Sequence, residues 1–222
     1  MKLIQVILAQ SIAAVTPNHG FGYLPDALSA VLGRYKFVDF PSQPHQFFPA
    51  DSNDPINFRH GKIEIGGKTI VIAWLQIFQS GVAISTDSDT KDSDLVLDDV
   101  LDWAASRFNL EFKIVRPGFG HLSQIVVQLE RNLSDYFPAL KPVLADVQSK
   151  LDDFYTAKPA YELTSLLFHF DQSIHPSLAP NGIRLEPRAG VPFDQRLYYS
   201  EAPLSTENHL ELIQRIEAAL SR

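Results

Sequence analysis

The sequence predicts an α+β protein built on a largely antiparallel sheet, with helices packed mainly on one face. Three observations support this fold class. Strand-like segments joined by tight turns run through residues 58–86, helical periodicity follows in 94–108, and a similar order of strands and helix returns in 161–220. Strands joined by short turns pair antiparallel, and the change of hydrophobic period marks the helices.

The chain begins with an ambiguous apolar segment, which a short helix and a long loop follow. The spacing of apolar residues in Met1–Val15 suits either a buried helix or a first strand. Pro25 is typical of a helix start, and Gly33 of a helix end. The apolar face of this helix is formed by Leu28, Val31 and Leu32. The segment Asp39–Asn57, rich in Pro and Phe, predicts a long loop.

The clearest strands form a meander over residues 58–86. Ile63 and Ile65 alternate with polar residues, and Gly66-Gly67 is a two-residue hairpin signal. Thr69–Phe78 is rich in β-branched and aromatic residues, so we expect a central strand there. After a turn at Ser80-Gly81, Val82–Ser85 completes the meander as a third strand.

The middle of the chain predicts two helices and two strands. Asp94–Phe108 has one apolar face, and Ser93 or Asp94 is the expected N-cap. A strand over Glu111–Arg116 should end at Pro117-Gly118. The other elements expected here are a strand over His121–Leu129 and a helix over Leu140–Tyr155 with Pro142 in its first turn.

The last third predicts three strands and a helix, as in residues 58–108. The strands are expected at Tyr161–Asp171, Ile183–Glu186 and Leu197–Tyr199, and the helix at Thr206–Leu220. The expected core face of that helix is Leu212, Ile213, Ile216 and Leu220. We interpret residues 1–222 as a single α+β domain, with a division near 157–160 into two strand-strand-strand-helix halves as the alternative.

Composition excludes several classes of protein. The 222 residues include no cysteine, so disulfide scaffolds, cysteine nucleophiles and thiolate metal sites are excluded. The formal net charge of -7 argues against a nucleic-acid partner or an anionic membrane surface. No segment is apolar for long enough to predict a membrane span, and we expect a cytoplasmic protein. P-loop, dinucleotide-binding, zinc-protease and nucleophile-elbow motifs are absent.

A basic and aromatic patch near the end of the chain is the first candidate binding surface. If residues 183–186 and 196–199 pair as a hairpin, arginine and tyrosine side chains share one face. Arginine forks suit carboxylates and phosphates, and tyrosine adds a flat apolar surface. The candidate residues are Arg184, Arg188, Arg196, Tyr198 and Tyr199. Ordinary surface pairing of these arginines with Glu186, Asp194 and Glu201 is the alternative interpretation.

The loop at 39–57 is the second candidate surface. Its aromatic residues include Phe47 and Phe48, which either cover an open sheet edge or bind a partner. Together, the patch and the loop lead us to predict a non-enzymatic binding or assembly module. We expect its partner to be another protein or a second copy of the chain, and we expect no cofactor.

Two groups of residues are candidate metal ligands, as alternatives to the interpretations above. His169 and Asp171 fall on one side of a predicted strand, and His175 could complete a divalent-metal site for a metal-dependent hydrolase. Six aspartates fall between Asp87 and Asp99, but the glycine of a calcium loop is missing. We therefore interpret this acidic run as helix-capping and solvated, and a cation site as its alternative.

Overall fold

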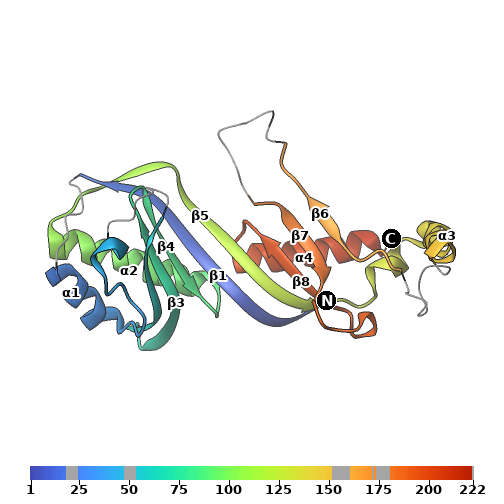
Figure 1. Ribbon diagram of the computed structural model, residues 1–222, viewed down its shortest axis with the longest axis horizontal. Helices are drawn as coiled ribbons and strands as arrows, with labels where there is room; N and C mark the ends of the chain where they lie inside the picture. The colour runs from blue at the N-terminus through green and yellow to red at the C-terminus, as the bar shows by residue number, and fades with distance from the viewer. Residues whose placement is uncertain (19–24, 48–53, 152–160, 172, 174–180, 222) are drawn as a thin grey trace. The chain divides into compact units, whose positions relative to one another are not determined.

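The fold is seen in a computed structural model that describes residues 1–18, 25–47, 54–151, 161–171, 173 and 181–221 (Figure 1). The chain divides into two compact units. We call residues 6–123 and 203–206 the amino-terminal unit, and residues 1–5, 124–202 and 207–222 the carboxy-terminal unit. The alternative division point near 157–160 lies outside the described residues.

The sheet of the amino-terminal unit contains the predicted meander. Its strands are β1 (Lys2–Pro17), β2 (Ile56–Ile65), β3 (Lys68–Phe78), β4 (Gly81–Thr86) and β5 (Phe112–Gln128). Their hydrogen-bonding order is β2-β3-β4-β1-β5, and the meander strands pair antiparallel. The ambiguous first segment is therefore a strand, and its odd-numbered residues from Ala9 to Val15 are buried. β1 and β5 also contribute their ends to the carboxy-terminal unit.

Pro117-Gly118 does not end a strand, as the sequence suggested. β5 runs without a break from Phe112 to Gln128, so the two predicted strands are one. A proline can occupy a strand wherever its missing N–H has no partner to bond, and sequence pattern alone does not reveal such positions.

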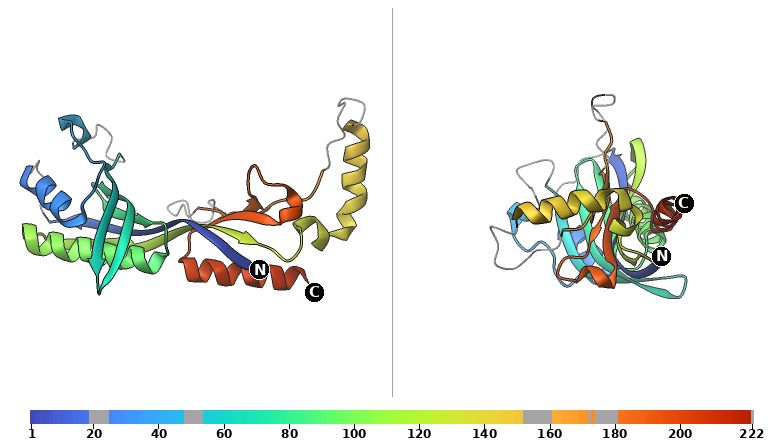
Figure 2. Two further views of the ribbon diagram at one scale, coloured as in Figure 1. Left: turned by 90° about the horizontal axis from the view of Figure 1, so that it is seen from below. Right: turned by 90° about the vertical axis from the view of Figure 1, so that its right-hand side faces the viewer.

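Helices α1 (Pro25–Tyr35) and α2 (Thr90–Phe108) pack on one face of this sheet. Figure 2 shows α2 running along the strands. α2 starts four residues before the predicted start because Asp89 is its N-cap, and the Asp89 carboxylate accepts the Asp92 N–H at 3.0 Å. α1 continues past Gly33 and ends where Lys36 adopts a positive φ of 53°.

The interior between these helices and the sheet is mostly apolar, with buried polar residues at the start of α2. Ile72, Ile84 and Val96 are fully buried there. Gly61 is required at one close approach, because a Cβ at this position would lie 2.9 Å from the Tyr35 carbonyl and within 2.6 Å of the Phe37 ring. The predicted face of α1 joins this core through Leu28, Val31 and Leu32.

The carboxy-terminal unit has a second antiparallel set of strands. It contains β6 (Leu166–Phe168), β7 (Ile183–Pro187) and β8 (Leu197–Ala202), in the order β5-β8-β7-β6. Its helices are α3 (Lys141–Leu151) and α4 (Thr206–Leu220, with Thr206 in the other unit). Figure 2 shows α4 along one face of the strands. Four short 3-10 helices complete the described elements: Pro44–Gln46 in the amino-terminal unit, and Leu133–Tyr136, Pro138–Leu140 and Phe193–Gln195 in the carboxy-terminal unit.

Two predictions for this unit need correction. The strand expected over Tyr161–Asp171 is only three residues long, because just Leu166–Phe168 pairs with β7. The buried stripe of α4 contains Ile213 as predicted, but it also contains His209 and Glu217. A helical stripe recurs every three to four residues, so polar residues can occupy it when they have hydrogen-bond partners. No helix among the described residues is long and apolar enough to cross a membrane.

Candidate functional site

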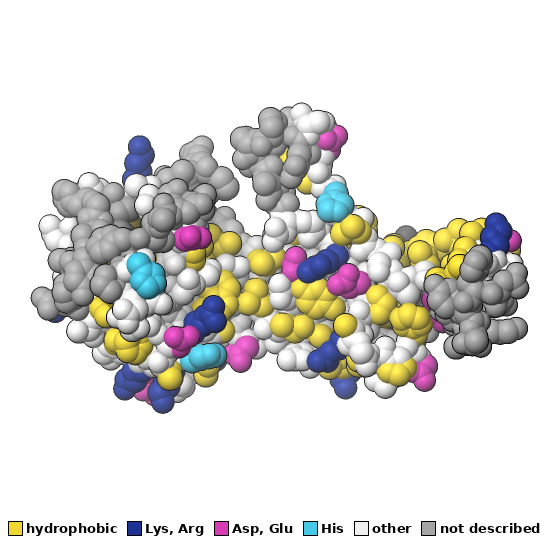
Figure 3. Space-filling model, viewed as in Figure 1, with side chains coloured by type: hydrophobic (Ala, Val, Ile, Leu, Met, Phe, Trp, Pro, Cys, Tyr) yellow, Lys and Arg dark blue, Asp and Glu magenta, His cyan; other side chains and the backbone are white. Residues whose placement is uncertain are grey.

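The β7–β8 hairpin separates its side chains into two faces. Arg184 pairs with Glu201, and Glu186 pairs with Tyr199, so these four side chains lie on one face. Leu185 and Ser200 lie on the opposite face, where the Ser200 hydroxyl is 2.8 Å from His209 Nε2 of α4. The face with Arg184 is therefore the one that α4 does not cover. Figure 3 shows acidic, basic and apolar side chains together over these strands.

Arg184 is the central residue of this uncovered face. One guanidinium nitrogen, Nη2, lies 3.2 Å from Glu201 Oε2 and 3.3 Å from the Tyr199 hydroxyl. Its guanidinium also lies 5.1 Å from the centre of the Tyr199 ring, within the range of a cation–π interaction. Glu186 Oε1 is 3.9 Å from Nη1, which allows an ion pair but no hydrogen bond.

Glu201 accepts three hydrogen bonds at a single oxygen. Besides Arg184, Oε2 accepts from the Tyr199 hydroxyl at 2.8 Å and from Gln124 Nε2 at 2.7 Å. Burial, together with the bond to Glu201, raises the pKa of Tyr199 to about 12. The hydrogen bond to Tyr199, followed by the charge of Glu201, raises the pKa of Arg184. Tyrosine therefore stays neutral and arginine charged at physiological pH.

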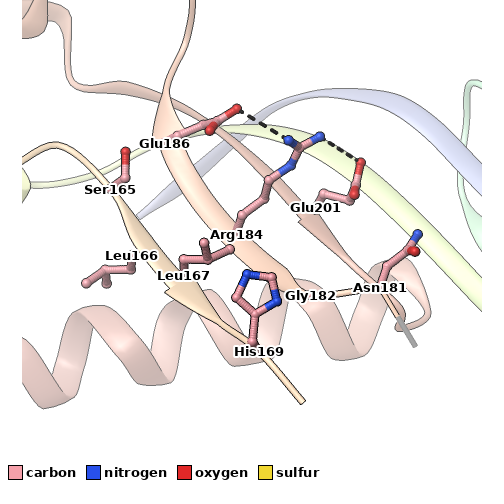
Figure 4. Close-up of a pocket in the computed structure, with 9 residues that line it drawn as sticks. All are labelled: Ser165, Leu166, Leu167, His169, Asn181, Gly182, Arg184, Glu186 and Glu201. Atoms are coloured by element: carbon pink, nitrogen blue, oxygen red, sulfur yellow. Dashed lines mark hydrogen bonds and ion pairs between the residues drawn. The ribbon is translucent and has the colours of Figure 1, made fainter. Parts of the chain in front are cut away.

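A pocket of about 390 Å³ lies beside this cluster (Figure 4). Its wall contains Arg184, Glu186 and Glu201 from the hairpin, and Leu167 from β6. His169 also lines the pocket, close to Gly182, where an added Cβ would lie 3.3 Å from the imidazole ring. Ser165, Leu166 and Asn181 complete the wall together with Gly182. The wall thus combines one guanidinium, two carboxylates, the His169 imidazole and an apolar strand.

Only part of the predicted Arg/Tyr patch is assembled. Arg184 and Tyr199 share a face as expected, but Tyr198 does not join them, because it alternates onto the α4 side and is 4% exposed. Its hydroxyl accepts the Leu133 N–H at 3.0 Å. Arg196 donates to the Glu130 carbonyl, and Arg188 donates its backbone N–H to the Leu197 carbonyl at 2.9 Å. Neither of these two arginines lines the pocket.

The predicted metal cluster is only partly described. His169 lines the pocket, whereas the Asp171 carboxylate accepts the backbone N–H of Ser173 at 2.9 Å. Hydrogen bonds from Ser173 lower the pKa of Asp171. His175 lies outside the described residues, so the three-ligand site stays a prediction. Within the described ranges, no group of three His, Asp or Glu side chains is placed to hold a metal ion.

The acidic run on α2 has protein partners at several positions. Asp89 caps the helix, and Asp92 pairs with Lys68. The Asp94 carboxylate accepts the Ser11 hydroxyl at 2.6 Å and lies 2.9 Å from His121 Nε2. The Asp89 cap agrees with the helix-capping interpretation of the run. Asp92 is buried and Asp94 contacts side chains of the sheet, so these two carboxylates are not simply solvated as predicted. Of the two phenylalanines proposed as binding residues in the 39–57 loop, Phe47 is half-buried, and Phe48 lies outside the described residues.

Sequence reasoning missed two polar residues of the site, Gln124 and Asn181. Gln124 comes from β5, which the hairpin prediction did not place beside β8. Asn181 directly precedes β7, and no motif marks it. The alternation of side chains along His121–Leu129 was the available signal for Gln124, but it needed the strand order to become useful.

No known protein family matches this chain, and no characterised protein matches it significantly in sequence.

Proposed function

We propose that this protein is a binding module that takes an extended segment of a partner protein along β6, beside the Arg184 pocket. One observation carries the proposal. β6 is the last strand in the described hydrogen-bonding order, and it exposes 58% of Leu167 and 49% of Phe168. These two neighbours point to opposite faces of the sheet, so a segment placed beside β6 has apolar contacts on both.

The physical basis is strand addition. The main-chain groups of an edge strand that its one neighbour does not use point away from the sheet, and they can pair with an added strand. Such pairing supplies affinity, while side-chain pockets along the edge supply specificity. The pocket at Arg184 is placed for the second role, since Leu167 belongs to both the edge strand and the pocket wall.

A displayed library of random peptides, selected on the full chain, tests the proposal. We expect selected peptides to bind Leu167→Asp at least tenfold more weakly than the wild-type chain, because a charge on the edge opposes strand addition. Val71→Asp is the matched control, since Val71 is also an exposed strand residue, 54% exposed, but lies on β3. The selected peptides should bind Val71→Asp as tightly as they bind the wild-type chain.

Hydrogen exchange locates the binding independently of the variants. We expect the peptide to slow amide exchange within residues 165–169 and to leave the other edge strand, β2, unchanged. The proposal is overturned if no peptide is selected, or if selected peptides bind Leu167→Asp as tightly as wild type and slow no amide in 165–169.

A further inference from the structure

We infer that the bound segment carries a lysine or arginine opposite Ser165, whose charge reaches Glu186, and apolar residues opposite Leu166 and Phe168. This inference rests on the proposed function and adds the chemistry of the segment. It is carried by three features of the site: the charge of the pocket wall, the register of β6 on β7, and the exposed apolar side chains of β6.

The charge of the wall favours a cation. Arg184 is the one guanidinium among the lining residues, and Glu186 and Glu201 are two carboxylates. Arg184 is already engaged by Glu201, and Glu201 has three donors on one oxygen. Glu186 lies 3.9 Å from the nearest Arg184 nitrogen, beyond hydrogen-bond distance, and its side chain is 42% exposed. It is therefore the carboxylate best placed to receive a hydrogen bond from a ligand.

The register gives the cation a path to Glu186. Leu166 pairs with Leu185 and Leu167 with Arg184, so continuing the ladder by one residue sets Ser165 opposite Glu186. Figure 4 shows Ser165 and Glu186 on the same part of the wall. Neighbouring strands lie about 4.8 Å apart, so an added strand lies about 10 Å from β7. A long basic side chain passes over the small Ser165 side chain, and it bridges this distance together with the Glu186 side chain.

The apolar requirement comes from the other face of β6. Leu166 borders the pocket, but its side chain and that of Phe168 alternate to the face opposite Leu167, and Phe168 remains half exposed. Cross-strand neighbours lie within side-chain contact distance, so apolar residues at the two facing positions would cover this surface. An acidic residue opposite Ser165 would instead meet the Glu186 carboxylate at close range, which is unfavourable.

The peptides selected from the displayed library test this inference. We expect Lys or Arg to be enriched at one position of the selected peptides, the position opposite Ser165. Apolar residues should be enriched one and three positions away from it, opposite Leu166 and Phe168. Changing that basic residue to Gln should weaken binding about tenfold to the wild-type chain, as loss of a charge-assisted contact does. The same change should have little effect on binding to Glu186→Gln, because that variant lacks the carboxylate. Glu64→Gln, on an exposed position of β2, is the matched control and should behave as wild type.

The outcomes separate this inference from the proposed function. If peptides bind at 165–169 but show no basic enrichment, prefer acidic residues, or bind Glu186→Gln as tightly as wild type, the segment chemistry is wrong and strand addition stands. If no peptide is selected, both are wrong. Circular dichroism of each variant should match that of the wild type, since Glu186 and Glu64 are not buried.

Discussion

Both units bury apolar residues, but their long helices α2 and α4 differ in where they bury polar residues. In the amino-terminal unit, α2 buries its polar residues Thr90, Asp92 and Ser93 only in its first turn. The rest of its buried face is aliphatic, with Val96, Leu97 and Val100. In the carboxy-terminal unit, α4 buries His209 and Glu217 on either side of Ile213. The Glu217 carboxylate accepts the Glu130 N–H at 2.7 Å and pairs with the Met1 amino group at 2.7 Å.

This difference shows that a helix can be fixed on a sheet in two ways. Apolar burial is non-directional and tolerates small shifts, so it stabilises without dictating one geometry. Buried polar groups must keep their partners, so they fix the geometry and lose stability when one partner is removed. We therefore expect the amino-terminal unit to respond to lost volume, and the carboxy-terminal unit to respond to pH and lost hydrogen bonds.

The largest effect is expected from Leu97→Ala in the apolar interior. Leu97 is 2% exposed, so truncation should leave a cavity and cost about 4 kcal/mol of unfolding free energy. Both tryptophans of the chain, Trp74 and Trp103, lie in this unit, so urea unfolding followed by tryptophan fluorescence reports on it. Leu95→Ala, at a position 46% exposed on the same helix, should cost less than about 1 kcal/mol. Equal losses of unfolding free energy in Leu97→Ala and Leu95→Ala would contradict tight packing around Leu97.

The next effect is a pH dependence of the carboxy-terminal unit that His209 causes. Burial lowers the pKa of His209 from 6.5 to about 4. The folded unit therefore excludes a proton that the unfolded chain binds below pH 6.5. The free energy of unfolding therefore has its full value above pH 6.5. It falls by about 3 kcal/mol as the pH drops toward 4. Amide exchange along α4, followed between pH 7 and pH 4, measures the loss after correction for intrinsic exchange rates.

The His209→Gln variant isolates this effect. The Ser200 hydroxyl donates to the Arg184 carbonyl at 2.7 Å, so His209 Nε2 must donate to Ser200. A glutamine amide can also donate, but it does not titrate in this range. We expect the variant to lose most of the pH dependence, and an unchanged profile would show that His209 is not its source.

The smallest of the three effects is expected from Tyr198→Phe. The change leaves the buried Leu133 N–H without its acceptor and should cost about 2 kcal/mol, measured by amide exchange in the carboxy-terminal unit. Tyr161→Phe, at a position 41% exposed in the same unit, should be within about 0.5 kcal/mol of wild type. An unchanged free energy of unfolding in Tyr198→Phe would mean that water replaces the lost acceptor.

The fold was largely predictable because its strong signals are local. Gly66-Gly67 and the alternation around Ile63 defined the β2–β3 hairpin without any tertiary information. The start of α2 was less accessible, because several aspartates compete as N-cap and only the geometry selects Asp89. The strand predicted over 161–171 was too long for a related reason. Pairing with a neighbouring strand, and not propensity, decides where β6 ends.

The site was predictable only where one hairpin contained it. Alternation along β7 and β8 placed Arg184 with Tyr199, because both residues belong to neighbouring strands. The same rule should have excluded Tyr198, which differs from Tyr199 by one residue and so faces the interior. Gln124 and the wall formed by β6 depend on strand order, which short-range patterns do not encode.

The discontinuity of both units bears on how the chain is made. The amino-terminal unit is completed by residues 203–206, and the carboxy-terminal unit includes residues 1–5. Most strands of the amino-terminal unit are therefore synthesised early. Its closing segment, residues 203–206, is synthesised only after most of the chain. Contacts between such distant segments form slowly, and their unpaired edges stay exposed meanwhile. A fragment ending at residue 123 would lack the closing segment, and its complement would lack the first five residues.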